Sequence, residues 1–162
     1  MQRAPNAGGI GLFLKNSKIS QQCFVTSEPL AATPAPANVK PFLVSESGYN
    51  PYTTVLVTKR SRYEKNPQEV KKVAGAVRAG WTQYLKDPAS ANSQMMKLNP
   101  AMDKDTFAKS AAAQKALILT VESQRQGLGV MSSKRWEALA DQLFEIGLTK
   151  KKIDTKKLFE NL

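Results

Sequence analysis

Apolar residues follow two patterns along the chain: short continuous runs before residue 59, and a helical spacing from Asn66 onward. Before residue 59, three short runs rich in β-branched, aromatic or other apolar residues are bounded by Gly, Pro and Ser, and they cover residues 21–27, 39–45 and 53–58. Runs of this length and composition are typical of strands. We therefore expect three short strands, with a break at Pro34 and Pro36 between the first and the second.

From Asn66 onward, apolar residues recur three and four positions apart, which is the spacing of one face of a helix. The first predicted helix covers residues 67–86, with Asn66 as its N-cap and Pro67 in its first turn. Asp87-Pro88 ends this helix and caps a second one, which runs to about Lys97.

Further helices are predicted downstream from their capping residues. One starts at Asp103 or Asp105, the next starts at Ser132 or Ser133 and is closed by Gly147 in a left-handed conformation, and Asp154 caps a last short helix. Trp81 and Trp136 lie on apolar stripes of their helices. We expect both indoles to have a structural role in the core.

Short strands followed by a helical carboxy-terminal half predict an α/β chain. We place the boundary between its two regions after residue 58. Residues 1–58 then carry the strands, and residues 59–162 form a helical carboxy-terminal region.

The chain carries 24 Lys and Arg against 13 Asp and Glu, a net charge of +11, and most of the excess lies after residue 58. A nucleic-acid binder can have such a charge. However, few aromatic residues alternate with the basic ones, so we interpret the basic clusters as solvated helix faces and expect no nucleic-acid partner.

The chain has no histidine and a single cysteine, Cys23. These counts exclude an internal disulfide, histidine-dependent catalytic triads and most zinc sites. We expect Cys23 to be a buried apolar side chain. No metal and no cofactor is expected.

Candidate binding residues gather around two turns. Glu28 follows the first apolar run and precedes Pro29, while Tyr49, Asn50 and Tyr52 lie on a Gly/Pro turn before the third run. Aromatic faces, one amide and one carboxylate can stack on, hydrogen-bond and orient a small polar heterocycle. A carboxylate favours a solute with cationic or N–H donor character.

Two sequence stretches, Gln21–Pro29 and Gly48–Val57, resemble the NMT1/THI5-like solute-binding proteins, the periplasmic binding components of ABC importers. The resemblance continues through Asn66-Pro67, Gly80-Trp81 and Asp87-Pro88 to the ending Trp136–Gly147, and it covers the later part of the family's pattern. It implies a partial type II periplasmic-binding-protein-like fold. Residues 1–58 would be a remnant of the second lobe, with a return crossover strand between lobes.

The resemblance also implies a function. The solute would be a thiamine-pyrimidine precursor or a nitrate-, sulfonate- or taurine-type molecule, with Glu28 as acidic contact and Tyr49, Asn50 and Tyr52 near the cleft and hinge. The partners would be this solute and an ABC permease, with self-association through surfaces left by the missing lobe. The full-length family member would be periplasmic or extracellular, although Met1–Gly9 shows no signal-peptide pattern.

Two alternatives remain open. One is a basic module that binds nucleic acid or acidic surfaces. The other is an enzyme similar to the pyrimidine synthases of thiamine biosynthesis, which share this resemblance. Those enzymes carry a cysteine-rich metal motif, and one cysteine without histidine departs from it. We therefore expect no enzymatic activity.

Overall fold

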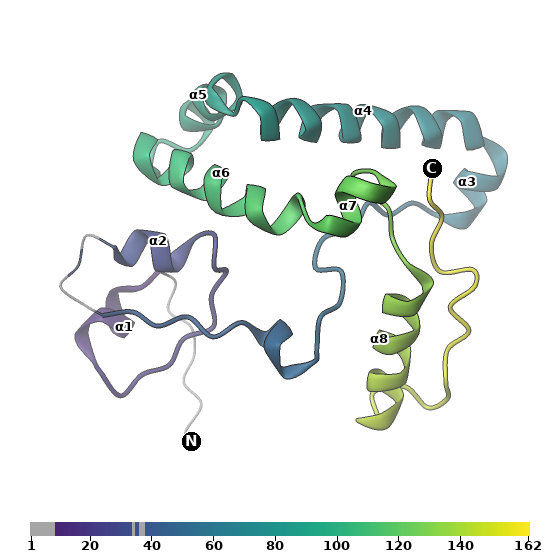
Figure 1. Ribbon diagram of the computed structural model, residues 1–162, viewed down its shortest axis with the longest axis horizontal. Coiled ribbons are helices and arrows are strands. Elements are labelled where there is room, and N and C mark those ends of the chain that lie inside the picture. Colours follow the sequence, from purple (N-terminus) through teal and green to yellow (C-terminus); the bar gives the residue numbers. More distant parts are fainter. Residues whose placement is uncertain (1–8, 34, 36–37) are drawn as a thin grey trace. The chain divides into compact units, whose positions relative to one another are not determined.

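The computed structural model describes residues 9–33, 35 and 38–162 (Figure 1). Its helices are α1 (Gly11–Lys15), α2 (Glu28–Ala32), the 3-10 helix η1 (Val44–Ser47), α3 (Arg60–Lys65), α4 (Pro67–Lys86), α5 (Ala89–Leu98), α6 (Lys104–Ile118), α7 (Val121–Gln126) and α8 (Ser133–Glu145). The chain forms two compact units. The first holds the described residues up to Phe42 together with Asp87–Leu117, and the second holds Leu43–Lys86 and Ile118–Leu162.

The predicted α/β class and its partial type II periplasmic-binding-protein-like sheet are wrong for the described residues, which contain helices and no strand. In the first run, residues 25–27 form a turn instead. The N–H of Ser27 donates to the carbonyl of Phe24 at 2.9 Å, and the N–H of Phe24 donates to the Glu28 carboxylate at 2.9 Å. These local hydrogen bonds take the place of a strand ladder.

The other two runs lack a neighbouring strand. In the second, Pro41 has no N–H to give to a ladder, and Val44–Ser47 closes into η1. In the third, residues 55–59 have no regular structure, and the side chains of Leu56 and Val57 are 59% and 82% exposed. β-branched residues suit a pleated surface, but an unpaired run is not a strand. The predicted crossover strand at 52–58 is therefore absent.

The longer predicted helices are present in the structure, and residues near their ends make capping contacts. α4 spans Pro67–Lys86, and the Asp87 carboxylate then accepts from the N–H of Ala89 at 3.0 Å to start α5. The Asp103 carboxylate accepts from the N–H of Thr106 at 2.8 Å at the start of α6. Gly147 follows α8 with a φ of 72°, the left-handed conformation that glycine tolerates.

The short elements were harder to predict. Sequence patterning did not indicate α3, α7 or η1 as separate helices. At the other end of the chain, the Asp154 carboxylate accepts from the N–H of Lys156 at 3.0 Å, but residues 156–158 form a turn and not the predicted helix.

In the second unit, the carboxy-terminal segment runs back along α8 (Figure 1). Lys152 forms an ion pair with Asp141 at 2.7 Å, and Phe159 stacks on Trp136 with ring centroids 5.8 Å apart. Near the start of α8, the Asn161 side chain donates to the carbonyl of Met131 at 2.9 Å and accepts from its N–H at 2.8 Å. The segment is thus antiparallel to the helix and fixed at both ends.

Few large apolar side chains are buried. The buried apolar residues among those described are Ala32, Leu85, Phe107, Ala111 and Ala140. On α4, Val73, Val77 and Trp81 lie four residues apart on one side and are 49%, 42% and 39% exposed. The expectation of a core position is therefore wrong for Trp81, whereas Trp136 is half-buried. In the part of the chain that is described, no helix combines the length and apolar character needed to cross a membrane.

Candidate functional site

One residue of α8, Arg135, makes three hydrogen bonds to the Gly48–Tyr52 turn. The guanidinium donates through Nε to the Asn50 carbonyl, and through Nη2 to the Asn50 side-chain oxygen at 2.7 Å and the Pro51 carbonyl at 2.9 Å. The turn and this arginine are 85 residues apart in sequence. Three charge-assisted donors on one planar group fix both the backbone and the side chain of Asn50.

Tyr52 fixes the same turn from its other end. Its hydroxyl accepts from the N–H of Ser132 at 2.8 Å, which satisfies a backbone donor at the start of α8. Its ring lies 4.2 Å from the guanidinium carbon of Arg135, a cation–π contact. Trp136 is tilted against it with ring centroids 5.9 Å apart. Since Trp136 also stacks on Phe159, three aromatic rings form a continuous cluster.

A shallow hollow of about 360 Å³ opens between this turn and α8. Its walls come from three segments of the second unit. These are the turn with Gly48, Asn50 and Pro51, Glu122 of α7, and α8 with its N-cap, through Ser132, Lys134, Arg135, Ala138, Leu139 and Gln142. The Gln142 side chain donates to the Gly48 carbonyl at 3.0 Å and closes one end. The hollow therefore exists because α8 holds the turn at both ends.

Some side-chain groups of the predicted site residues make no contact with other described residues. Tyr49 is 40% exposed, and its ring makes no aromatic or cation–π contact with a described residue. The Asn50 side-chain oxygen is bound by Arg135, whereas its amide NH₂ donates to none of the described residues. Tyr52, by contrast, is half-buried, with its hydroxyl and its ring both in contact with α8. Tyr49 and Asn50 can thus contact a solute, and Tyr52 supports them.

Glu28, the fourth predicted site residue, belongs to the first unit, whereas the turn belongs to the second. Glu28 is half-buried at the start of α2, and one carboxylate oxygen accepts from the N–H of Phe24. The other oxygen has no hydrogen-bond donor among the described residues. The local fold thus fixes the Glu28 side chain and leaves one oxygen for a ligand.

Cys23, close to Glu28, is exposed, which corrects the expectation that it is buried. Partial desolvation, followed by the negative charge of Glu28, raises the pKa of the Cys23 thiol above its ordinary value. A raised pKa leaves less thiolate near neutral pH, and the thiolate is the nucleophilic form. No group of three or more His, Cys, Asp and Glu side chains suited to a metal ion occurs among the described residues.

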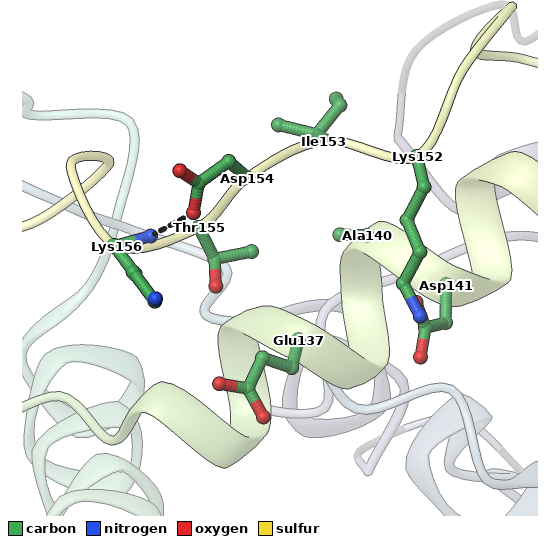
Figure 2. A pocket seen from close by; sticks show the side chains of 8 residues that line it. All are labelled: Glu137, Ala140, Asp141, Lys152, Ile153, Asp154, Thr155 and Lys156. Carbon is green, nitrogen blue, oxygen red and sulfur yellow. Dashed lines mark hydrogen bonds and ion pairs between the residues drawn. The ribbon is translucent and has the colours of Figure 1, made fainter.

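A second hollow, of about 260 Å³, lies between α8 and the returning segment (Figure 2). Three carboxylates line it, but two are engaged: Asp141 with the ammonium of Lys152, and Asp154 with the N–H of Lys156. The hydrogen bond and charge of Asp141 raise the pKa of Lys152. Thr155, which also lines the hollow, is 7% exposed. These contacts fasten the segment to α8, so we assign this hollow a structural role.

Comparison with known families identifies the segment that carries both candidate turns. Residues 19–91 match the family model described as NMT1/THI5 like, which confirms the resemblance over that segment. The family includes ABC solute-binding proteins and thiamine biosynthesis proteins, and its members generally bind small solutes. No curated protein and no solved structure matches the chain.

Arg135 is a residue of the candidate site that the sequence did not indicate. It lies outside the matched segment, yet it makes more hydrogen bonds to the turn than any other described residue. In sequence it is the second half of a Lys-Arg pair near a predicted helix start, a pattern shared with ordinary solvated faces. Arg135 differs from other basic residues only in lying in the first turn of α8, and no sequence periodicity relates that position to residue 50.

Proposed function

We propose that this chain is a solute-binding component of an ABC importer, or the carboxy-terminal part of one. The match of residues 19–91 to the NMT1/THI5-like family carries the proposal, because that segment holds Glu28 and the whole Gly48–Tyr52 turn. For a full-length member we expect a periplasmic or extracellular location and an ABC permease as partner. We propose binding and not catalysis, since the chain has one cysteine and no histidine.

The free groups of the turn support a small polar solute with a flat ring. The exposed ring of Tyr49 offers a stacking face, and the Asn50 amide NH₂ offers a donor. Glu28 offers an acceptor oxygen. A carboxylate attracts N–H donors and cations and repels anions. Glu28 and the turn belong to different units, and each taken by itself suits an aminopyrimidine, such as a thiamine-pyrimidine precursor, better than nitrate, a sulfonate or taurine.

The proposal is tested by calorimetry of the full chain with an aminopyrimidine, taurine and nitrate. We expect the aminopyrimidine to bind most tightly. Tyr49→Ala should weaken its binding by roughly tenfold, from the loss of one stacked ring, whereas Tyr49→Phe, which keeps the ring, should bind nearly as the parent chain does. If none of the three solutes binds, even at millimolar concentration, the proposal is wrong.

Glu28→Gln separates the solute classes within the same measurement. It keeps the shape of the side chain and removes its charge, so affinity for the aminopyrimidine should fall and affinity for the anions should not. If Glu28→Gln leaves aminopyrimidine binding unchanged, the acidic contact lies elsewhere, although the chain can still be a solute-binding protein.

Self-association belongs to the same proposal. The exposed stripe Val73, Val77 and Trp81 of α4 presents an apolar face that a soluble monomer usually covers. Analytical ultracentrifugation over a range of protein concentrations should show larger species as concentration rises. Trp81→Gln should shift the distribution toward the monomer, and a parent chain that stays monomeric throughout would contradict self-association.

A further inference from the structure

Two basic segments that are distant in sequence meet on the surface of the second unit. The Nη2 group of Arg60, at the start of α3, donates to the carbonyl of Lys157. This contact spans 97 residues and brings Lys59 and Arg60 next to Lys156 and Lys157. All four side chains are exposed.

These four cations are not neutralised within the described part of the chain. The ion pairs among the described residues are Arg62 with Glu69 and Lys152 with Asp141, and none of the four takes part in them. The nearest acids in sequence are Glu64, Asp154 and Glu160. Of these, Asp154 binds a backbone N–H of the same segment and no ammonium group. Like charges held together repel one another, and an anionic surface would relieve that repulsion.

Exposed aliphatic side chains accompany both pairs of cations. Val55, Leu56 and Val57 lead into Lys59 and are 38%, 59% and 82% exposed. Leu158 follows Lys157 and is 49% exposed. We name the set formed by Val55–Val57, Lys59, Arg60 and Lys156–Leu158 the basic-aliphatic surface.

We propose that the basic-aliphatic surface binds the headgroup region of an anionic lipid bilayer. Lysine and arginine next to a membrane are attracted by its negative surface potential, and neighbouring aliphatic side chains enter the boundary between headgroups and acyl chains. The surface offers both components in one place, and it would lie on the membrane without crossing it.

A nucleic acid is the competing polyanion, and the residue types argue against it. Single strands stack their bases on exposed aromatic rings, which alternate with the cations of such proteins. Here the nearest aromatic in sequence to Lys157 is Phe159, which stacks on Trp136, and the nearest to Arg60 is Tyr63, which is half-buried. Freely exposed aliphatic residues next to lysines favour lipid.

The test is co-sedimentation of the full chain with vesicles. The parent chain should bind vesicles of phosphatidylcholine mixed with phosphatidylserine, and should not bind vesicles of phosphatidylcholine alone. The double variant Lys156→Gln/Lys157→Gln should bind the mixed vesicles at least roughly tenfold more weakly, because each cation near an anionic surface contributes severalfold. The matched control Lys109→Gln/Lys115→Gln removes the same charge from α6, outside the surface, and should change binding by less than about twofold.

The aliphatic component has its own variant, Leu56→Ser/Val57→Ser, which keeps every charge. It should weaken vesicle binding several-fold and leave binding to duplex DNA unchanged. Far-UV circular dichroism checks that each variant keeps its helices, and Lys59→Gln replaces the double lysine variant if that one does not fold.

The proposal is overturned by any of three results. Equal binding to neutral and anionic vesicles would remove the electrostatic component, and parent-like vesicle binding by the Leu56→Ser/Val57→Ser variant would remove the aliphatic one. Binding to DNA or RNA without binding to vesicles would identify the surface as a nucleic-acid site. None of these measurements contains a solute, so their outcome is independent of the proposed solute binding.

Discussion

Glu28 and the Gly48–Tyr52 turn lie in the same family-matched segment, but different kinds of contact hold them. The Glu28 carboxylate is held by the N–H of Phe24, four residues away. The turn is held by Arg135, Ser132 and Gln142, which are 80 to 94 residues away. The first candidate contact is thus encoded by its immediate neighbours, and the second depends on α8 being folded and in place. Changes in α8 should therefore affect the turn and leave the Glu28 contact intact.

The largest expected effect lies in the aromatic cluster that supports the turn. Trp136→Ala removes the ring that contacts both Tyr52 and Phe159, and should lower the free energy of unfolding by about 3 kcal/mol. Trp136→Phe should cost less than about 1 kcal/mol, because it keeps a ring and removes an indole N–H that has no acceptor among the described residues. Urea unfolding measures both values. Equal losses for Ala and Phe would show that stacking is not what Trp136 contributes.

Removing Arg135 should have the next largest effect. Arg135→Ala deletes three hydrogen bonds and the cation–π contact with Tyr52, and should cost about 2 kcal/mol in the same assay. The neighbouring exposed residue is the matched control, and Lys134→Ala should cost less than about 0.5 kcal/mol. Arg135→Lys should recover only part of the loss, since an ammonium lacks the planar fork. If Arg135→Ala lowers the free energy of unfolding no more than Lys134→Ala does, Arg135 does not stabilise the turn.

Glu28→Gln should have a smaller effect on stability than either change in α8. The amide oxygen of glutamine can still accept from the N–H of Phe24, so the free energy of unfolding should fall by less than about 0.5 kcal/mol. Solute binding, measured alongside, should respond more strongly than stability. A stability loss as large as that of Arg135→Ala would show that Glu28 has a structural role beyond its own turn.

The smallest expected effect concerns another local contact, at Asp103. The hydrogen bond from the backbone N–H of Thr106, followed by the one from its hydroxyl, lowers the pKa of Asp103. A lowered pKa in the folded state means that Asp103 stabilises α6 above its unfolded-state pKa of about 4, and that this contribution is lost as the pH falls through the lowered value. An NMR titration of the carboxyl group measures that pKa directly. Asp103→Asn should remove the pH dependence, and Asp105→Asn, two residues further along the chain, should keep it.

The same division between local and distant contacts explains what the sequence could predict. Asn66-Pro67, Asp87-Pro88 and Gly147 act within a few residues, and the helices that they bound were predicted correctly. The prediction of three strands was wrong because a strand requires a partner strand, and no described segment pairs with these runs. Pro41 is a sequence signal against the second run, whereas the hydrogen bond from Phe24 to Glu28 that replaces the first is visible only in the structure.

The candidate site divides in the same way. The residue types beside a Gly/Pro turn made Tyr49, Asn50 and Tyr52 candidates, but they did not indicate that Tyr49 is exposed while Tyr52 contacts the start of α8. The two tyrosines differ because Ser132 and Arg135 engage Tyr52, and both follow it by 80 residues or more. The spacing of residues along the chain does not predict such a contact, because the contact depends on how the helices pack.

The separation of 85 residues between Asn50 and Arg135 also determines how long after Asn50 the ribosome adds Arg135. Ribosomes add about 5–20 residues per second, so roughly 4–17 s pass between the appearance of the turn and that of the arginine that fixes it. During this interval the nascent chain carries Asn50 and Tyr52 without the arginine that contacts them, next to the apolar run 53–58. A chaperone that protects this chain on the ribosome would thus be needed at that stretch first, and slow codons before residue 135 would lengthen the exposure.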